Sequence, residues 1–280
     1  RMLDIKSFYE ADSGTWTHLL ADPDSKTAAI IDPVWVYDPV SGMADTTFID
    51  DVLAAAEHAQ CRVEWVLETH AHADHLSAAE LVRRATGARL ACGAGITAVQ
   101  HNFARVFNLA DLPTDGRQFD RLLREGDELR LGNLRIRVIE TPGHTSDSIT
   151  YLVGDAAFIG DTLFAPHAGS ARCDFPGGDA GRLYDSVMKL YALPPQTRLF
   201  LCHDYPAEGA QPVSGVTVAR SRAENIHIRD GRDKAGFVQQ REERDRTLAL
   251  PRLILPALQV NILGGRAPAA EDNGVSYLKI

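Results

Sequence analysis

Short runs of apolar residues, bounded by turn residues, recur along the chain and predict β-strands. The runs cover residues 26–31, 63–67, 129–139, 149–153, 156–159 and 198–202. Gly154-Asp155 lies between two of these runs and predicts a hairpin turn. Apolar residues at helical spacing predict helices over 48–59 and 77–85, and Gly87 is the stop signal of the second. Strand, polar loop and helix follow one another, which is typical of an α/β protein.

The pattern changes in the last quarter of the chain. After Gly215 a charged, helix-permissive stretch runs to Arg246, and Pro251 and Pro256 then predict an irregular tail. The sequence contains no repeats and no stretch with the composition of a linker. We therefore predict one domain over residues 2–280, with helical and irregular decoration from about residue 215.

Composition and charge narrow the class of protein. With 45% hydrophobic and 24% charged residues, the 280-residue chain is typical of globular proteins. Its net charge of −9 argues against a nucleic-acid partner held by general phosphate attraction. Residues 253–258 are too few to span a membrane, and Asp4 and Lys6 lie where a secretory signal would need apolar residues. The four cysteines form no CxxC pair, so we expect a reducing, cytoplasmic location and no membrane partner.

Side chains that bind metal ions gather at the predicted strand ends. The densest group is the HxHxDH motif formed by His70, His72, Asp74 and His75. Three further candidates each follow a strand or a tight turn, and these are His144, Asp161 and His203. Imidazole nitrogens and carboxylate oxygens together suit zinc, iron or manganese. The other histidines, predicted to be surface or packing residues, are His18, His58, His101, His167 and His227.

These motifs resemble the metal-site series of the metallo-β-lactamase superfamily. The resemblance rests on HxHxDH at 70–75, the Gly-His-Thr sequence at 143–145, the Gly-Asp-Thr-Leu-Phe sequence at 160–164, and His203. It implies an α/β fold, the αββα sandwich of two mixed β-sheets flanked by helices, with the metal at one open edge. Residues 170–178 and 202–205 resemble the persulfide dioxygenases, also called sulfur dioxygenases, which are close to glyoxalase II-like proteins.

The resemblance implies an activity and a set of ligands. Persulfide dioxygenases oxidise glutathione persulfide with O2 and water to glutathione and sulfite. The ligands that they imply here for one Fe(II) per chain are His70, His144 and Asp161. The remaining ligand-type residues support these ligands by hydrogen bonding or hold a second metal, and they are His72, Asp74, His75 and His203. With two zinc ions, the same residues would suit a hydrolase of thioesters or lactones. A third alternative is a non-catalytic metal or persulfide sensor, against which stands the lack of a recognisable effector module.

Candidate substrate residues follow the metal motifs. Arg172 has a planar fork that matches a substrate carboxylate, and it could also form a structural pair with Asp174, since the two roles are compatible. Tyr205 could donate to the substrate sulfur, and with His203 and Arg172 it completes the predicted catalytic set. The expected partners are a small thiol or persulfide and O2, and a homodimer is compatible with the sequence.

Other residues in the last third of the chain have two interpretations. On a predicted helix, Arg220, Arg222 and Asn225 could contact glutathione or form a solvated face. Cys173 is either a persulfide carrier or a small packing residue, and its neighbour Arg172 is expected to lower the pKa of the thiol.

Overall fold

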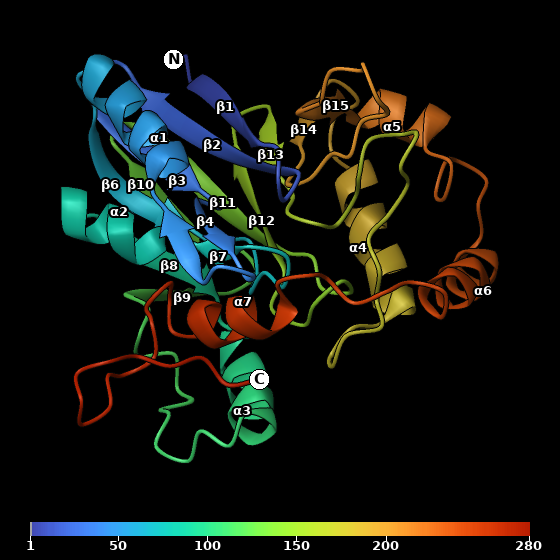
Figure 1. The fold of residues 1–280 in the computed structure, drawn as a ribbon. Helices are drawn as coiled ribbons and strands as arrows, with labels where there is room; N and C mark the ends of the chain where they lie inside the picture. Colours follow the sequence, from blue (N-terminus) through green and yellow to red (C-terminus); the bar gives the residue numbers. More distant parts are fainter. Residues whose placement is uncertain (1) are drawn as a thin grey trace.

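Two six-stranded β-sheets face each other in the structure, a computed structural model that describes residues 2–280 (Figure 1). The first sheet contains, in spatial order, β1 (Asp4–Glu10), β2 (Thr15–Asp22), β3 (Thr27–Ile31), β6 (Arg62–Leu67), β8 (Arg89–Gly93) and β9 (Arg121–Leu123). The second contains β10 (Glu128–Leu131), β11 (Leu134–Glu140), β12 (Ile149–Val153), β13 (Ala156–Phe158), β14 (Arg198–Phe200) and β15 (Gly215–Thr217). Both sheets are mixed, since β3 pairs with β6 and β13 with β14 in parallel and the hairpins are antiparallel.

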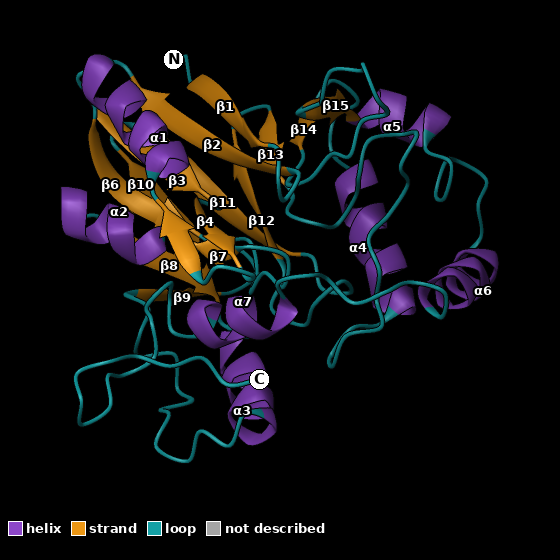
Figure 2. Cartoon of the chain, in the orientation of Figure 1, coloured by secondary structure: helices purple, strands orange, loops and turns teal. Residues whose placement is uncertain are grey.

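Helices cover the outer face of each sheet (Figure 2). On the first sheet these are α1 (Thr47–His58), α2 (Ala79–Thr86) and α3 (Ile96–Val106). On the second they are α4 (Ala180–Tyr191) and α5 (Val218–Glu224), and α6 (Lys234–Asp245) packs against α4. A small sheet of β5 (Met43–Asp45), β4 (Val34–Asp38) and β7 (Leu76–Ser77) packs against α7 (Ile254–Asn261). The predicted αββα sandwich is therefore confirmed.

Alternation of apolar side chains along the strands builds the layers. In β2, Leu19 faces the helices while Leu20 faces the second sheet. In β3, Ile30 likewise faces the helices and Ile31 faces the second sheet. Successive side chains of a strand point to opposite faces, so a strand that is apolar on both faces must lie between two layers. The apolar runs that predicted these strands thus also determine the sandwich.

The C-terminal part differs from the predicted irregular tail, because residues 254–261 form α7. Pro256 lies in the first turn of this helix, where the backbone N–H groups have no partner inside the helix, so a proline is tolerated. The second predicted helix is also shorter than expected. It begins at Ala79 because Ser77 belongs to β7, and it ends at Gly87 in the left-handed conformation as predicted.

The loops that follow β3, β6, β11, β13 and β14 carry the polar residues of interest. One of these loops is fixed by a glycine, because Gly143 has φ of 144° and an added Cβ would collide with the backbone of Leu183 in α4. Only glycine combines this backbone conformation with such a close approach. The turn before His144 is thereby pressed against the second helical layer.

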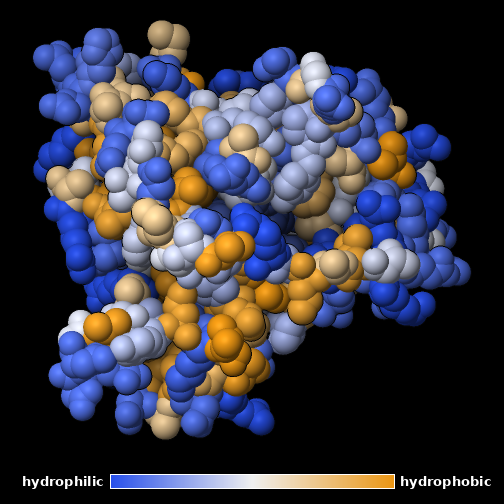
Figure 3. Space-filling model, viewed as in Figure 1, coloured by the Kyte–Doolittle hydropathy of each residue, from blue (hydrophilic) through white to orange (hydrophobic). Residues whose placement is uncertain are grey.

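Apolar side chains also reach the surface along the segment that leads into α7 (Figure 3). Leu248 and Leu250 of this segment and Leu255 in the first turn of α7 are exposed. Among residues 2–280, no helix has the length and apolar character needed to cross a bilayer.

The buried His18 on β2 makes the stability of the fold depend on pH. Its two ring nitrogens contact the Ser7 hydroxyl and the Leu201 carbonyl, each at 2.8 Å, and burial lowers the pKa of the imidazole to about 4. The unfolded chain takes up a proton near pH 6.5 and the folded chain only near pH 4, so stability is lost as pH falls through this window.

We expect the metal-free protein to lose about 2 kcal/mol of unfolding free energy through His18 between pH 7 and pH 5. His18→Gln retains a donor for the Leu201 carbonyl but does not titrate, so its loss should be smaller by that amount. Urea unfolding of both proteins at the two pH values measures the difference. Equal losses in both proteins would contradict the assignment.

Candidate metal centre

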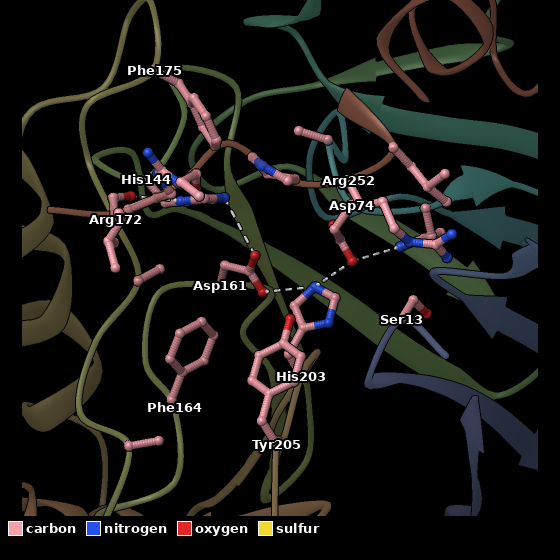
Figure 4. A pocket seen from close by; sticks show the side chains of 18 of the residues that line it. Ser13, Asp74, His144, Asp161, Phe164, Arg172, Phe175, His203, Tyr205 and Arg252 are labelled. Carbon is pink, nitrogen blue, oxygen red and sulfur yellow. Dashed lines mark hydrogen bonds and ion pairs between the residues drawn. The ribbon is translucent and has the colours of Figure 1, made fainter. Parts of the chain in front are cut away.

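The structure brings all seven predicted metal ligands to one edge of the sandwich. They come from the loops after β6, β11, β13 and β14, and they are His70, His72, Asp74, His75, His144, Asp161 and His203. Asp161 lies between His144 and His203 (Figure 4). The HxHxDH motif and the later residues are far apart in sequence, so the packing of the two sheets creates this cluster.

A first set of ligands consists of His70, His144 and Asp161. The Nε2 atoms of His70 and His144 lie 3.5 and 3.3 Å from Oδ2 of Asp161. Ligand atoms of all three residues lie within 4.8 Å of one another, and all three residues are buried. Two imidazoles and one carboxylate can therefore contact a single ion from one side.

A second set lies on the other side of Asp161 and consists of His72, Asp74, His75 and His203. The Nε2 atom of His203 is 3.3 Å from Oδ2 of Asp74 and 3.4 Å from Oδ1 of Asp161. Asp161 thus directs one oxygen toward each set. This arrangement can accommodate one ion or a pair of ions that share Asp161.

Five donor atoms of the two sets lack hydrogen-bond partners within residues 2–280. The buried, unpartnered atoms of the cluster are Nε2 of His70, Nδ1 of His72, Nε2 of His75, Nε2 of His203 and Oδ1 of Asp161. Leaving a buried polar group unpaired is costly, so such atoms are rare outside binding sites. Imidazole nitrogens and a carboxylate converging in this way fit a divalent metal ion.

Electrostatics favours the metal-binding protonation states of four ligands, while Asp32, against the effect of burial, raises the pKa of a fifth, His72. Burial opposes ionisation of Asp161 and Asp74, but their histidine neighbours, His203 above all, outweigh it and lower the pKa of both carboxyl groups. Burial also lowers the pKa of His144 and His75. Ionised carboxylates and neutral imidazoles are the forms that bind metal.

A carboxylate beneath the cluster, Asp32, was missed by the sequence analysis. Its Oδ1 is 2.9 Å from Nε2 of His72 and also accepts from the Thr69 amide at 2.9 Å. Its Oδ2 accepts from the Thr69 hydroxyl at 2.8 Å. Because Nε2 of His72 is held by Asp32, its Nδ1 is left to face the other ligands. The position of Asp32, directly after β3, was the available signal.

Other ligands are oriented by groups that no motif indicates. Nδ1 of His144 donates to the Arg172 carbonyl at 2.7 Å. The Thr15 hydroxyl lies 3.2 Å from Nδ1 of His203 and 3.4 Å from Nδ1 of His75. Each of these imidazoles therefore turns its Nε2 toward the centre.

A cavity of about 570 Å³ opens onto the cluster. Its floor includes His144, Asp161 and His203, and its wall includes Phe164 and Phe175. The opposite wall combines residues of β4 with the segment between α6 and α7. A small molecule can therefore reach the metal ligands from solvent.

Arg172 lines this cavity, but its guanidinium is already engaged. Nε and Nη2 donate to the Asp174 carboxylate at 2.7 and 2.8 Å, and Nη1 donates to the Ala249 carbonyl at 2.6 Å. The structure therefore shows the pair with Asp174, one of the two compatible roles that the sequence left open. Tyr205 also lines the cavity, where its ring is parallel to the His203 ring with centroids 6.0 Å apart.

Three predicted substrate residues lie outside the cavity lining. Arg220 pairs with Glu224 and Arg222 pairs with Asp230, each at 2.9 Å. The short helix α5 turns both arginines to solvent, as in the alternative interpretation of a charged face. Asn225 is buried, where its amide donates to the Gly169 carbonyl at 3.0 Å.

The expectation for Cys173 was wrong in direction. Burial above all, and then the neighbouring Asp245, raise the pKa of this thiol, and the guanidinium of Arg172 is paired with Asp174. Cys173 packs in the core between the second sheet and its helices. This environment favours a small packing residue over a reactive thiol.

Two arginines that the sequence analysis did not select line the cavity. Within residues 2–280, the side chains of Arg244 and Arg252 form no hydrogen bond or ion pair. The neighbouring Arg241 is instead tied to Asp245 and to the Ser170 carbonyl. The end of α6 and the segment that follows it thus bring two uncommitted positive charges to the cavity of a chain that is acidic overall.

The contact between Asp32 and His72 predicts a loss of metal affinity when the carboxylate is changed. We expect Asp32→Asn to weaken zinc binding to the metal-free protein roughly 10-fold to 100-fold, because the carboxylate orients His72. Asp22→Asn is the matched control, since Asp22 is a buried strand-end carboxylate bonded to the Ser25 hydroxyl and the Asn133 amide. Competition with a chromogenic chelator measures the zinc affinity of both variants and of the wild-type protein. Equal losses in the two variants would contradict a specific role for Asp32.

Comparison with known proteins agrees with this geometry. The chain is 47% identical to a probable metallo-hydrolase of Burkholderia pseudomallei, over 99% of this chain and 98% of that protein. It is 46% identical to a beta-lactamase hydrolase-like protein of Agrobacterium fabrum, over 98% of this chain but only 64% of that protein's length. Human persulfide dioxygenase ETHE1 is 30% identical over 72% of this chain and 68% of that protein.

The fold is also similar to solved structures. The crystal structure of ETHE1 from Myxococcus xanthus superposes with a TM-score of 0.76 at 29% identity, over 94% of this chain and all of that one. The sequence profile of the metallo-beta-lactamase superfamily matches residues 13–203, which include all seven predicted ligands. The chain belongs to the metallo-beta-lactamase superfamily.

Proposed function

We propose that this protein oxidises a low-molecular-weight persulfide, glutathione persulfide, with O2 and water to the thiol and sulfite. One Fe(II) per chain would be held by His70, His144 and Asp161. The observation that carries the proposal is the geometry of this set, two imidazoles and one carboxylate whose donor atoms converge beside an open cavity. Such a set leaves adjacent positions on iron free for substrate and O2. The likeness to ETHE1 over the whole of that structure supports the same activity.

Ferrous iron supplies the one-electron chemistry that lets triplet O2 react with a closed-shell sulfur anion. The residues of the chain bind and orient the reactants. His144 and Asp161 line the cavity floor, and the Arg172 carbonyl holds the imidazole of His144 in place. Phe164 and Phe175 line the cavity and would limit the access of water to the reacting sulfur.

The substrate would be held by Arg244 and Arg252. Glutathione carries two carboxylates, and a chain with a net charge of −9 repels it at long range, so local cations must bind it. Both guanidinium groups line the cavity and have no partner in the described chain. Tyr205 lies beside His203 at the same cavity and would donate to the substrate sulfur.

A hydrolase with two zinc ions is the second candidate, and one observation favours it. The unpartnered nitrogens of His72, His75 and His203 converge with the Asp74 carboxylate, where a second ion would bind, and Nε2 of His203 also lies 3.4 Å from Oδ1 of Asp161. Two ions that share a carboxylate can activate a water molecule for attack on a thioester or lactone. The printed name of the Burkholderia relative, a probable metallo-hydrolase, also supports this candidate.

Metal content and oxygen uptake separate the two candidates. We expect about one iron per chain in protein purified anaerobically without added zinc, because the first ligand set suits Fe(II). Glutathione persulfide should then drive O2 consumption with one sulfite formed per O2. Two tightly bound zinc ions with rapid thioester hydrolysis, and no O2 uptake, would exclude the dioxygenase.

Single ligand variants provide the control for this experiment. His144→Ala should lose iron and activity together, whereas His75→Ala should keep most of its iron and lose activity only in part. Equal loss of metal from both variants would favour the two-ion hydrolase.

We expect Arg252→Gln to raise KM for glutathione persulfide while the iron content is retained. Losing a hydrogen bond between charged groups should lower kcat/KM, and the loss should correspond to about 1.5–3 kcal/mol of transition-state stabilisation. Arg220→Gln is the matched control, because Arg220 is exposed and paired outside the cavity, and its KM should not change. Arg172→Lys should mainly lower thermal stability, since its fork joins Asp174 to Ala249. An unchanged KM in Arg252→Gln would remove Arg252 from the substrate site.

A further inference from the structure

The side chain of Asn261, at the end of α7, contacts the loop that carries the HxHxDH residues. Its Nδ2 donates to the carbonyls of His72 and His75, both at 2.8 Å. Its Oδ1 accepts from the Ser77 amide at 2.7 Å. The side chain is buried, and the amide therefore uses both of its N–H groups and its oxygen on one short stretch of backbone.

This stretch of backbone depends on such contacts. Residues 72–75 belong to no helix or strand of the described chain, so no regular ladder pairs their carbonyls. Buried backbone carbonyls require partners. One amide draws the carbonyls of His72 and His75 to the same point, and the turn between them carries Asp74. The position of Asn261 therefore fixes the shape of the turn that presents three metal ligands.

Asn261 itself is held rigidly. On α7, Ala257 and Val260 pack with Leu76 of β7 in a small apolar core. After the helix, a Cβ on Gly265 would lie 2.9 Å from the Ser77 carbonyl oxygen, so the chain passes directly against the same strand. The amide is thus presented from an element that is anchored on both sides of it.

We propose that Asn261 is a positioning residue of the metal centre. It sets the donor atoms of His72, Asp74 and His75 by closing their loop, and α7 is therefore part of the centre. This role applies to any divalent ion bound by the cluster. It goes beyond the proposed dioxygenase activity and can fail or succeed separately from it.

A pair of matched variants tests this role. Asn261→Asp keeps the size of the side chain and the acceptor for Ser77, but it directs a carboxylate oxygen at two carbonyls. Gln259→Glu makes the same chemical change on the same helix. The Gln259 amide bonds the Leu255 and Lys279 carbonyls and the Lys279 amide, which belong to the helix and the C-terminal tail.

The readouts are the affinity of the metal-free protein for Co(II) and the visible absorption spectrum of the cobalt form. We expect Asn261→Asp to weaken Co(II) binding roughly 10-fold to 100-fold and to change the spectrum, as for other groups that orient ligands. Gln259→Glu should lower the unfolding temperature and leave both readouts unchanged. Wild-type affinity and spectrum in Asn261→Asp would overturn the proposal.

Circular dichroism of the metal-free variants shows whether they fold. If Asn261→Asp does not fold, Asn261→Ser replaces it, since serine removes the two-carbonyl clamp without adding a charge. Weakened Co(II) binding with a changed spectrum in folded Asn261→Ser would support the proposal. Wild-type behaviour of this variant would overturn it.

Discussion

The metal centre depends on the contacts between the Asp161 carboxylate and the buried imidazoles around it. The two oxygens of this carboxylate lie 3.3–3.5 Å from Nε2 atoms of His70, His144 and His203. Several donor atoms around it have no hydrogen-bond partner in the described chain. Each such atom costs about 1–3 kcal/mol when nothing binds it. The sandwich must therefore hold in place a cluster that destabilises it until a metal ion binds.

Three of the histidine ligands are held in place by groups that contact the side of the ring facing away from the centre. Asp32 holds His72, the Arg172 carbonyl holds His144, and the Thr15 hydroxyl contacts His203. These groups fix the ring orientation and leave the inward nitrogen for metal. A metal site built this way needs little rearrangement on binding, because the strand ends and the turn at Gly143 already position the backbone.

The segment between α6 and α7 gives the centre its outer wall and its positive charge. It carries Arg252 into the cavity and accepts the Arg172 fork at the Ala249 carbonyl. The helix that follows supplies Asn261 to the metal loop. The part of the chain that was expected to be decoration thus contributes to both the cavity and the centre, because α7 packs on β7 beside the HxHxDH motif.

The sequence by itself determined the layers and the set of candidate ligands. Two-sided apolar strands can be buried only between two layers, and the HxHxDH spacing places four ligand-type residues on one loop. Both signals are local in the chain. Tertiary structure alone decided the partners of those ligands. Of the groups that hold His72, Asn261 is 189 residues and Asp32 is 40 residues away in the sequence. The tertiary structure also decided that Arg172 pairs with Asp174 and that Arg220 faces solvent. Hydrogen-bonding side chains can pair in many ways, and only the packing of α7 and the two sheets selects among them.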